Sequence, residues 1–131
     1  QGFYSASKFA VEGYSEALAI EVHPFGIQVC LVEPGDFKTN FTANRNISAA
    51  TLHHEDYGQT FAKSMKIIEE AENGGSNPEK LGLAICKLVK TKKPAFRTVV
   101  GPAGQVLFAK FKAILPDKLA LNIVRYFYKI N

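Results

Sequence analysis

The spacing of apolar residues changes several times along this chain, and these changes divide it into helical and extended segments. Residues 1–22 carry apolar side chains at helical spacing, which predicts a helix. Pro24 and Gly26 follow this segment, so we expect the helix to stop before them. Residues 27–32 are almost continuously apolar and rich in β-branched side chains, as expected for a strand inside a parallel sheet. Residues 96–100 predict a second strand.

The segments between and after these strands predict further helices. Residues 36–76 form a long, mostly polar insertion with a helix at about 55–72, and a connection of this length is typical of a lid. Asn77-Pro78 fits an N-cap followed by the first helical position, and the basic cluster at residues 90–93 suits the end of that helix. Two amphipathic segments, 103–115 and 117–129, meet at Pro116.

The alternation of helices and strands predicts an α/β fold with parallel strands. A parallel sheet needs several adjacent strands and cover on both faces, and the chain offers only two clear strands. We therefore expect it to be part of a doubly wound parallel sheet whose first half lies upstream of Gln1.

The first helix is apolar on two sides. One side, expected to meet the sheet, carries Tyr4, Lys8, Val11, Ser15, Leu18 and Val22. The opposite side carries Ala6, Phe9, Gly13, Ala17 and Ile20. Because a helix that is apolar on two sides has two partners, we expect either a second subunit or another helix of the same chain against that opposite side.

Charge and cysteine content narrow the classes of partner. The net charge of +4 arises after residue 109, where five Lys or Arg stand against one acidic residue. No base-reading motif accompanies this basic tail, so we expect no nucleic acid partner, and favour core or subunit packing of residues 117–129 over membrane docking. Cys30 and Cys86 fall in apolar patterns that predict reduced core thiols, which suits a cytoplasmic protein.

Tyr4 and Lys8 stand one helical turn apart and could carry chemistry. A free phenol ionises only near pH ~10, and a neighbouring ammonium favours the ionised form. Such a pair is suited to acid-base exchange near neutral pH. The same spacing is also common in exposed helical pairs without a function.

The loop that follows the first strand favours the chemical interpretation. The segments Tyr4-Ser5-Ala6-Ser7-Lys8 and Pro34-Gly35-Asp36-Phe37-Lys38-Thr39 together resemble the catalytic and cofactor motifs of short-chain dehydrogenases/reductases. The order of helix, strand, Pro-Gly loop, variable lid, capped helix and final strand is similar to this family over essentially all of the chain. The resemblance implies that residues 1–131 are the C-terminal, catalytic half of one Rossmann-like domain, with a substrate lid at about 36–76.

The resemblance also implies roles for individual residues. Tyr4 would exchange a proton with a carbonyl/alcohol substrate, and Lys8 would hold the ribose of NAD or NADP. The Pro34-Gly35 loop, with the Phe37 backbone amide and Thr39, would bind the nicotinamide and phosphates. The family's glycine-rich loop, an Asn and a Ser are expected upstream of Gln1; Ser5 and Ser7 are expected to bond locally. The family also implies a homo-oligomer, which we expect to form through the first helix.

Several side chains near the loop have more than one interpretation. Phe41, Tyr57 and Phe61 are candidates for an apolar substrate pocket, although ordinary lid packing explains them nearly as well. Glu33 is expected to play a structural hydrogen-bonding role at the strand end. His53-His54 is expected to be a solvated loop, because adjacent histidines rarely bind one metal, and we expect no metal site.

Two other functions remain open beside an oxidoreductase. A nonenzymatic sensor or scaffold could keep the dinucleotide fold, but it would need neither Tyr4 nor Lys8. An epimerase or dehydratase of the extended branch of the family would share both residues, but little chain follows the Pro-Gly loop to build its larger substrate domain.

Overall fold

The computed structural model describes residues 1–130. Its elements are, in order, α1 (Gly2–Glu21), the 3-10 helix η1 (His23–Phe25), β1 (Leu31–Pro34), α2 (Ala49–Leu52), α3 (Gly58–Asn73), α4 (Pro78–Lys90), β2 (Arg97–Val100), α5 (Ala103–Lys112) and α6 (Asp117–Phe127). Each helix and strand that the sequence pattern predicts is present, with ends shifted by a few residues.

The two strands pair in parallel, in a register that sets Leu31 beside Arg97 and Pro34 beside Val100. This confirms the predicted α/β class with parallel strands. The first strand begins four residues later than predicted, at residue 31 rather than 27. Its partner starts only at Arg97, and Pro94 ahead of it lacks the N–H that a longer ladder would use. Because the register pairs Pro34 with Val100, the last residues of the two strands, the strands end at the same level and the loops that follow them are neighbours.

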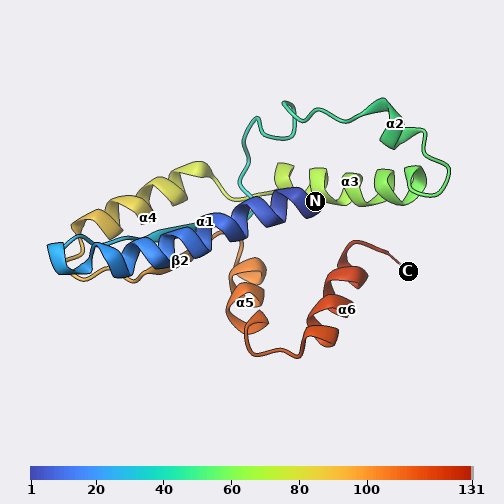
Figure 1. The fold of residues 1–131 in the computed structure, drawn as a ribbon. Helices are drawn as coiled ribbons and strands as arrows, with labels where there is room; N and C mark the ends of the chain where they lie inside the picture. Colours follow the sequence, from blue (N-terminus) through green and yellow to red (C-terminus); the bar gives the residue numbers. More distant parts are fainter. Residues whose placement is uncertain (131) are drawn as a thin grey trace.

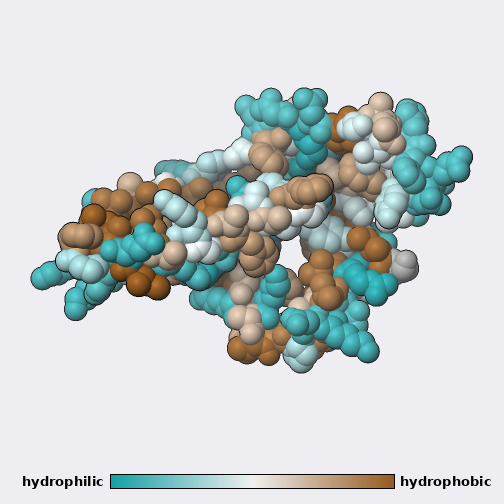
Figure 2. Space-filling model, in the orientation of Figure 1, coloured by the Kyte–Doolittle hydropathy of each residue, from teal (hydrophilic) through white to brown (hydrophobic). Residues whose placement is uncertain are grey.

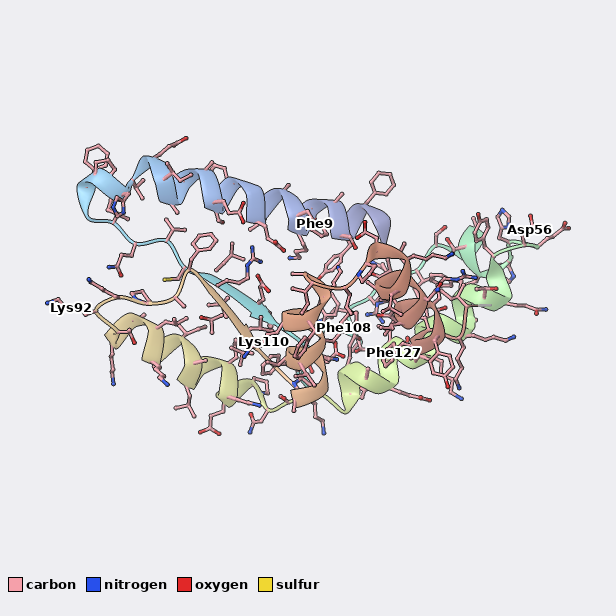
Figure 3. The ribbon with its side chains drawn as sticks, turned by 90° about the horizontal axis from the view of Figure 1, so that it is seen from below. Phe9, Asp56, Lys92, Phe108, Lys110 and Phe127 are labelled. Atoms are coloured by element: carbon pink, nitrogen blue, oxygen red, sulfur yellow. The ribbon has the colours of Figure 1, made fainter. Side chains whose placement is uncertain are left out.

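Helices cover both faces of this small sheet. Figure 3 shows α1 on one side of the strands and α4 on the other, which is the layering of a doubly wound fold. Figure 1 shows α3 and the loop that carries α2 beyond the end of the strands, with α5 and α6 forming a helical hairpin on another side. The connection from β1 to β2 thus passes through α2 and α3 before it returns along α4.

Local sequence explains where α4 starts and ends. The Asn77 side chain accepts a hydrogen bond from the Glu79 N–H at 3.0 Å, and Pro78 occupies the first helical position, as the sequence predicts. Lys87 and Lys90 lie in the last turn, where cations interact favourably with the helix dipole. The helices α5 and α6 each begin directly after a proline, Pro102 and Pro116.

The described chain leaves much of its apolar surface uncovered. Its accessible surface is 10370 Å², whereas a compact monomer of this mass exposes roughly 6,800 Å². Within residues 1–130, the only buried hydrophobic residues are Phe37, Met65, Val100 and Ala120. The prediction that Cys30 and Cys86 are core thiols is wrong, since both are exposed, and no described element covers them.

The helix α1 meets the sheet over only part of its length. Ser15, Leu18 and Val22 are partly buried, as predicted for this face, whereas Tyr4, Lys8 and Val11 remain exposed. A 20-residue helix is ~30 Å long, but four-residue strands reach only ~13 Å, so the described strands cannot cover all of it. None of the described helices is long and apolar enough to cross a membrane.

Candidate functional site

Tyr4 and Lys8 lie one turn apart near the start of α1. The Lys8 ammonium nitrogen is 5.3 Å from the centre of the Tyr4 ring, within the range of a cation–π contact. The Tyr4 side chain is 54% exposed, so its phenol is open to a ligand. Ser7 donates a hydrogen bond to the Tyr4 carbonyl at 2.7 Å, the local bond expected from the sequence.

An arginine on β2 ties α1 to the sheet. Arg97 bonds Glu12 at 3.0 Å and Glu16 at 3.4 Å on α1, and it also donates to Glu33 on β1. Hydrogen bonds to Glu12 and Glu33 raise the Arg97 pKa above its ordinary value. Glu33 thus has the structural role expected from the sequence, and this cluster fixes the helix that carries Tyr4 against the strand that leads to the Pro-Gly loop.

The Pro34-Gly35 loop is held from two sides. The Gly35 N–H donates to the Val100 carbonyl at 2.8 Å, beside the end of β2. Gln105 on α5 accepts from the Asp36 N–H at 2.8 Å, and its side-chain amide donates to the Asp36 carboxylate. From the other side, the Ser76 N–H donates to the Asp36 carbonyl at 2.9 Å. The backbone after β1 is therefore well fixed.

Three glycines allow this close packing. A Cβ on Gly35 would collide with the Gln105 side chain, and one on Gly75 would lie 2.6 Å from the Asp36 carbonyl oxygen. A Cβ on Gly101 would lie 3.1 Å from the Gly35 Cα. Sequence analysis missed Gln105 and these contacts, although Gly101-Pro102 at the end of a parallel neighbour strand was a usable signal, because the carboxyl ends of such strands meet at one edge.

The Phe37 N–H is a candidate ligand-binding group of this loop. The N–H groups of Gly35, Asp36 and Lys38 all have partners, but within residues 1–130 no hydrogen bond uses that of Phe37. The Phe37 side chain is buried and anchors the loop. The Thr39 hydroxyl accepts from the Phe41 N–H at 3.2 Å and remains exposed.

A cavity of about 660 Å³ lies between α1, the loop after β1 and the helices α2 and α3. Its lining includes Tyr4, Asp36, Phe41 and Phe61, so the structure brings three of the sequence-predicted site residues together with the residue after Gly35. Tyr57 is not part of the lining: it is 67% exposed and packs edge-on against His54. Phe41 and Phe61 thus share one cavity with the phenol of Tyr4.

The loop between β1 and α2 is bonded to α3 on one side of this cavity. Arg45 bonds Glu72 at 2.6 Å, and the Thr42 hydroxyl donates to the same carboxylate at 2.5 Å. The Arg45 guanidinium also lies 5.7 Å from the centre of the Phe41 ring. These contacts hold Phe41 in the cavity wall. Sequence analysis had no signal for them, because the partners are about 30 residues apart in the chain.

Tyr128, which follows α6, also lines the cavity. Burial raises the pKa of its phenol, and the negative charges of Asp36 and Glu72 raise it further. Its hydroxyl therefore keeps its proton to higher pH than a free phenol does. Among the described residues there is no cluster of three or more His, Cys, Asp or Glu side chains that could hold a metal ion.

Comparison with known proteins agrees with the motifs. The family model described as short chain dehydrogenase matches residues 1–50, which hold Tyr4, Lys8 and the Pro34-Gly35 loop. A 3-ketodihydrosphingosine reductase of Bacteroides thetaiotaomicron is 65% identical over 131 residues, which is all of this chain and 49% of that protein. The chain belongs to the short-chain dehydrogenase/reductase family.

Other relatives in the family are more distant. An NADPH-dependent 3-dehydrocapnine reductase of Ornithobacterium rhinotracheale is 34% identical over 128 residues, covering 98% of this chain and 44% of that protein. A 17-beta-hydroxysteroid dehydrogenase type 6 of Rattus norvegicus is 42% identical over 69 residues, which cover 46% of this chain and 22% of that protein. The chain spans about half the length of its two more extensively matched relatives.

Proposed function

We propose that this chain provides the proton-transfer pair and the cofactor loop of an oxidoreductase that transfers hydride between NAD(P) and a carbonyl/alcohol substrate. The observation that carries the proposal is the cavity that Tyr4 shares with Asp36, the residue next to Gly35. The reaction needs a phenol close to the cofactor loop, and Asp36 is the residue by which this loop reaches the cavity; Lys8, Pro34, Gly35, Phe37 and Thr39 are not part of its lining.

Tyr4 is the general acid in the direction of reduction. The nicotinamide supplies hydride to the carbonyl carbon, and negative charge grows on the carbonyl oxygen. The exposed Tyr4 phenol can donate a proton to that oxygen, a step that contributes typically 10²–10⁴-fold to rate. Lys8, whose ammonium lies over the Tyr4 ring, stabilises the phenolate that remains.

The loop after β1 fits a nicotinamide. The Phe37 N–H, which has no partner within residues 1–130, can donate to the carboxamide oxygen, and the exposed Thr39 hydroxyl can bond the carboxamide or a phosphate. Pro34 and Gly35 offer a surface without polar side chains against which a flat ring can lie. Gln105 and Ser76 hold this surface in place.

The substrate that we propose is a lipid-like ketone of the 3-ketodihydrosphingosine class. Phe41, Phe61, Met65 and Ile68 give the cavity an apolar wall beside Tyr4. The relative with 65% identity over the whole chain carries the name of a reductase for that compound. We leave Tyr57 out of the substrate site because it lies outside the cavity.

We also propose that the outer side of α1 binds a second copy of the protein in the cytoplasm. Phe9 and Ile20 are 64% and 77% exposed on this side, and nothing lies within 4 Å of a Cβ built on Gly13 between them. A facing helix can therefore approach closely. Light scattering of a Phe9→Glu variant should show a smaller assembly than that of Lys63→Glu, a change at an exposed position on α3.

The activity can be tested with the full-length protein, 3-ketodihydrosphingosine and each reduced cofactor in turn. We expect oxidation of NADPH or NADH together with formation of the corresponding alcohol, identified by mass spectrometry. Comparison of the two cofactors gives the preference. Absence of alcohol with both cofactors, in a protein that binds them, would contradict the proposed substrate class.

A further inference from the structure

A second cavity opens between the α5–α6 hairpin and α3. Its volume is about 470 Å³, within the usual range of ligand pockets. Most of its lining is apolar, and the apolar side chains are Ile68, Ala71, Phe108, Ile123, Val124 and Phe127. Figure 2 shows an opening between α5, α6 and the rest of the chain, and Figure 3 places Phe108 and Phe127 near each other on the two helices.

The second cavity lies next to the cavity that holds Tyr4. Asp36, Ile68 and Tyr128 line both, so the two spaces meet at these residues. The polar lining side chains of the second cavity are Asp36, Gln105 and Tyr128, and Asp36 is bonded to Gln105 at this junction. Polar side chains of Asp36 and Tyr128 thus lie at the boundary with the Tyr4 cavity, and the space between the helices beyond them is mostly apolar.

The side chains that line the second cavity indicate which class of ligand it binds. Asp36 is the only charged side chain among its lining residues, and it belongs to the junction. Ile123 and Phe127 are still 40% and 54% exposed, so apolar surface remains to be covered. An unbranched hydrocarbon chain covers such surface, and each buried methylene strengthens binding roughly fourfold.

We propose that this cavity binds the aliphatic chain of a single-chain lipid whose ketone end lies beside Tyr4, and that Phe108, Ile123 and Phe127 determine the accepted chain length. The inference rests on the proposed reductase function, and it adds the part of the protein that selects the chain length of the substrate. The lid contributes the wall at the reactive end, and the α5–α6 hairpin contributes the wall around the chain.

The test compares Ile123→Trp, which fills the cavity, with Leu121→Trp, an exposed position on the same helix that is not part of the lining. For the full-length protein, kcat/KM is measured with straight-chain 3-ketones of increasing length. We expect kcat/KM to rise with length in the unsubstituted protein and in Leu121→Trp. In Ile123→Trp the rise should stop about two methylenes earlier, a loss of roughly fifteenfold for long relative to short ketones.

A binding measurement separates this inference from the proposed reaction. Titration with the fluorescent fatty acid cis-parinaric acid, in the inactive Tyr4→Phe background, should show weaker binding when Ile123→Trp is added and no change with Leu121→Trp. If Ile123→Trp does not fold, Ala71→Phe fills the same cavity from α3.

Three outcomes are decisive. Weaker parinaric acid binding without any ketone turnover would support the chain site and reject the reductase function. Ketone turnover with the same length dependence in Ile123→Trp and Leu121→Trp would reject the chain site and leave the reductase function standing. Occupation of the cavity by a second copy, seen as dimer loss in Ile123→Trp with unchanged parinaric acid binding, would also overturn the proposal.

Discussion

Gln105 holds Asp36 by two hydrogen bonds, one to its backbone N–H and one to its carboxylate. The bond to the backbone fixes the loop after β1, and the bond to the carboxylate fixes the side chain at the junction of the two cavities. One residue of α5 therefore sets the position of both the proposed cofactor loop and the proposed entrance to the chain site.

Replacing Gln105 by Glu should loosen this loop. A second carboxylate would face that of Asp36, and the amide donor would be lost. We expect the free energy of unfolding to fall by about 1–3 kcal/mol and cofactor affinity to fall with it, measured by urea denaturation and by titration calorimetry. Adding Asp36→Asn restores a donor and acceptor pair and should recover both. An equal loss in Gln59→Glu, at an exposed position on α3, would contradict this account.

Gly75 is a second support of the same loop. A Cβ at this position would lie 2.6 Å from the Asp36 carbonyl oxygen and 2.8 Å from the Phe37 nitrogen, which are backbone atoms that cannot move aside cheaply. We expect Gly75→Ala to lower the free energy of unfolding by about 1–3 kcal/mol. The control is Gly82→Ala in α4, where nothing lies within 4 Å and alanine should stabilise by about 0.5–1 kcal/mol. Stabilisation by both changes would show that the loop is free to shift.

The position of α1 should depend on Arg97. Arg97→Met would leave Glu12, Glu16 and Glu33 facing one another without a cation. We expect a lower melting temperature at low salt and a smaller loss at high salt, because salt screens repulsion between partly exposed charges. Lys66→Met, which removes a single exposed pair with Glu70 at 4.0 Å, should have little effect at either salt concentration. A salt-independent loss in Arg97→Met would mean that packing of the arginine, rather than charge, holds the helix.

Tyr128 should titrate at higher pH than a free tyrosine. Its pKa is raised by burial and by Asp36 and Glu72, so the neutral phenol is the form that the fold favours. This contribution to stability is present below the unfolded value of ~10 and is lost as pH rises through the folded value. Tyrosinate absorbance should show a late transition that is absent in Tyr128→Phe and shifted to lower pH in Asp36→Asn. If the late transition persists in Tyr128→Phe but disappears in Tyr126→Phe, it belongs to Tyr126, which would contradict this prediction.

Much of the fold could be predicted from the sequence because its signals are local. The Asn77-Pro78 start of α4, the prolines ahead of α5 and α6 and the β-branched strands depend on neighbouring residues, and the structure has them as expected. The burial of Cys30 and Cys86 was predicted wrongly, because an apolar pattern shows which face favours cover but not whether an element covers it.

The candidate site was predictable only in part. Tyr4, Phe41 and Phe61 were chosen from motif and position, and they share one cavity. Gln105, Arg45 and Tyr128 were missed, because their partners Asp36 and Glu72 lie far away in the chain and meet only in three dimensions. Residues that act through tertiary contacts of this kind leave no mark on local spacing.

The central claim is that Tyr4 transfers the proton, and turnover of Tyr4→Phe beside Tyr14→Phe in the full-length protein tests it most directly. Both changes remove one hydroxyl from α1, but only Tyr4 lines the cavity, and Tyr14 is 69% exposed. We expect Tyr4→Phe to lower kcat by about 10²–10⁴-fold with cofactor affinity unchanged, and Tyr14→Phe to keep full activity. Equal turnover in the two variants would contradict the assignment.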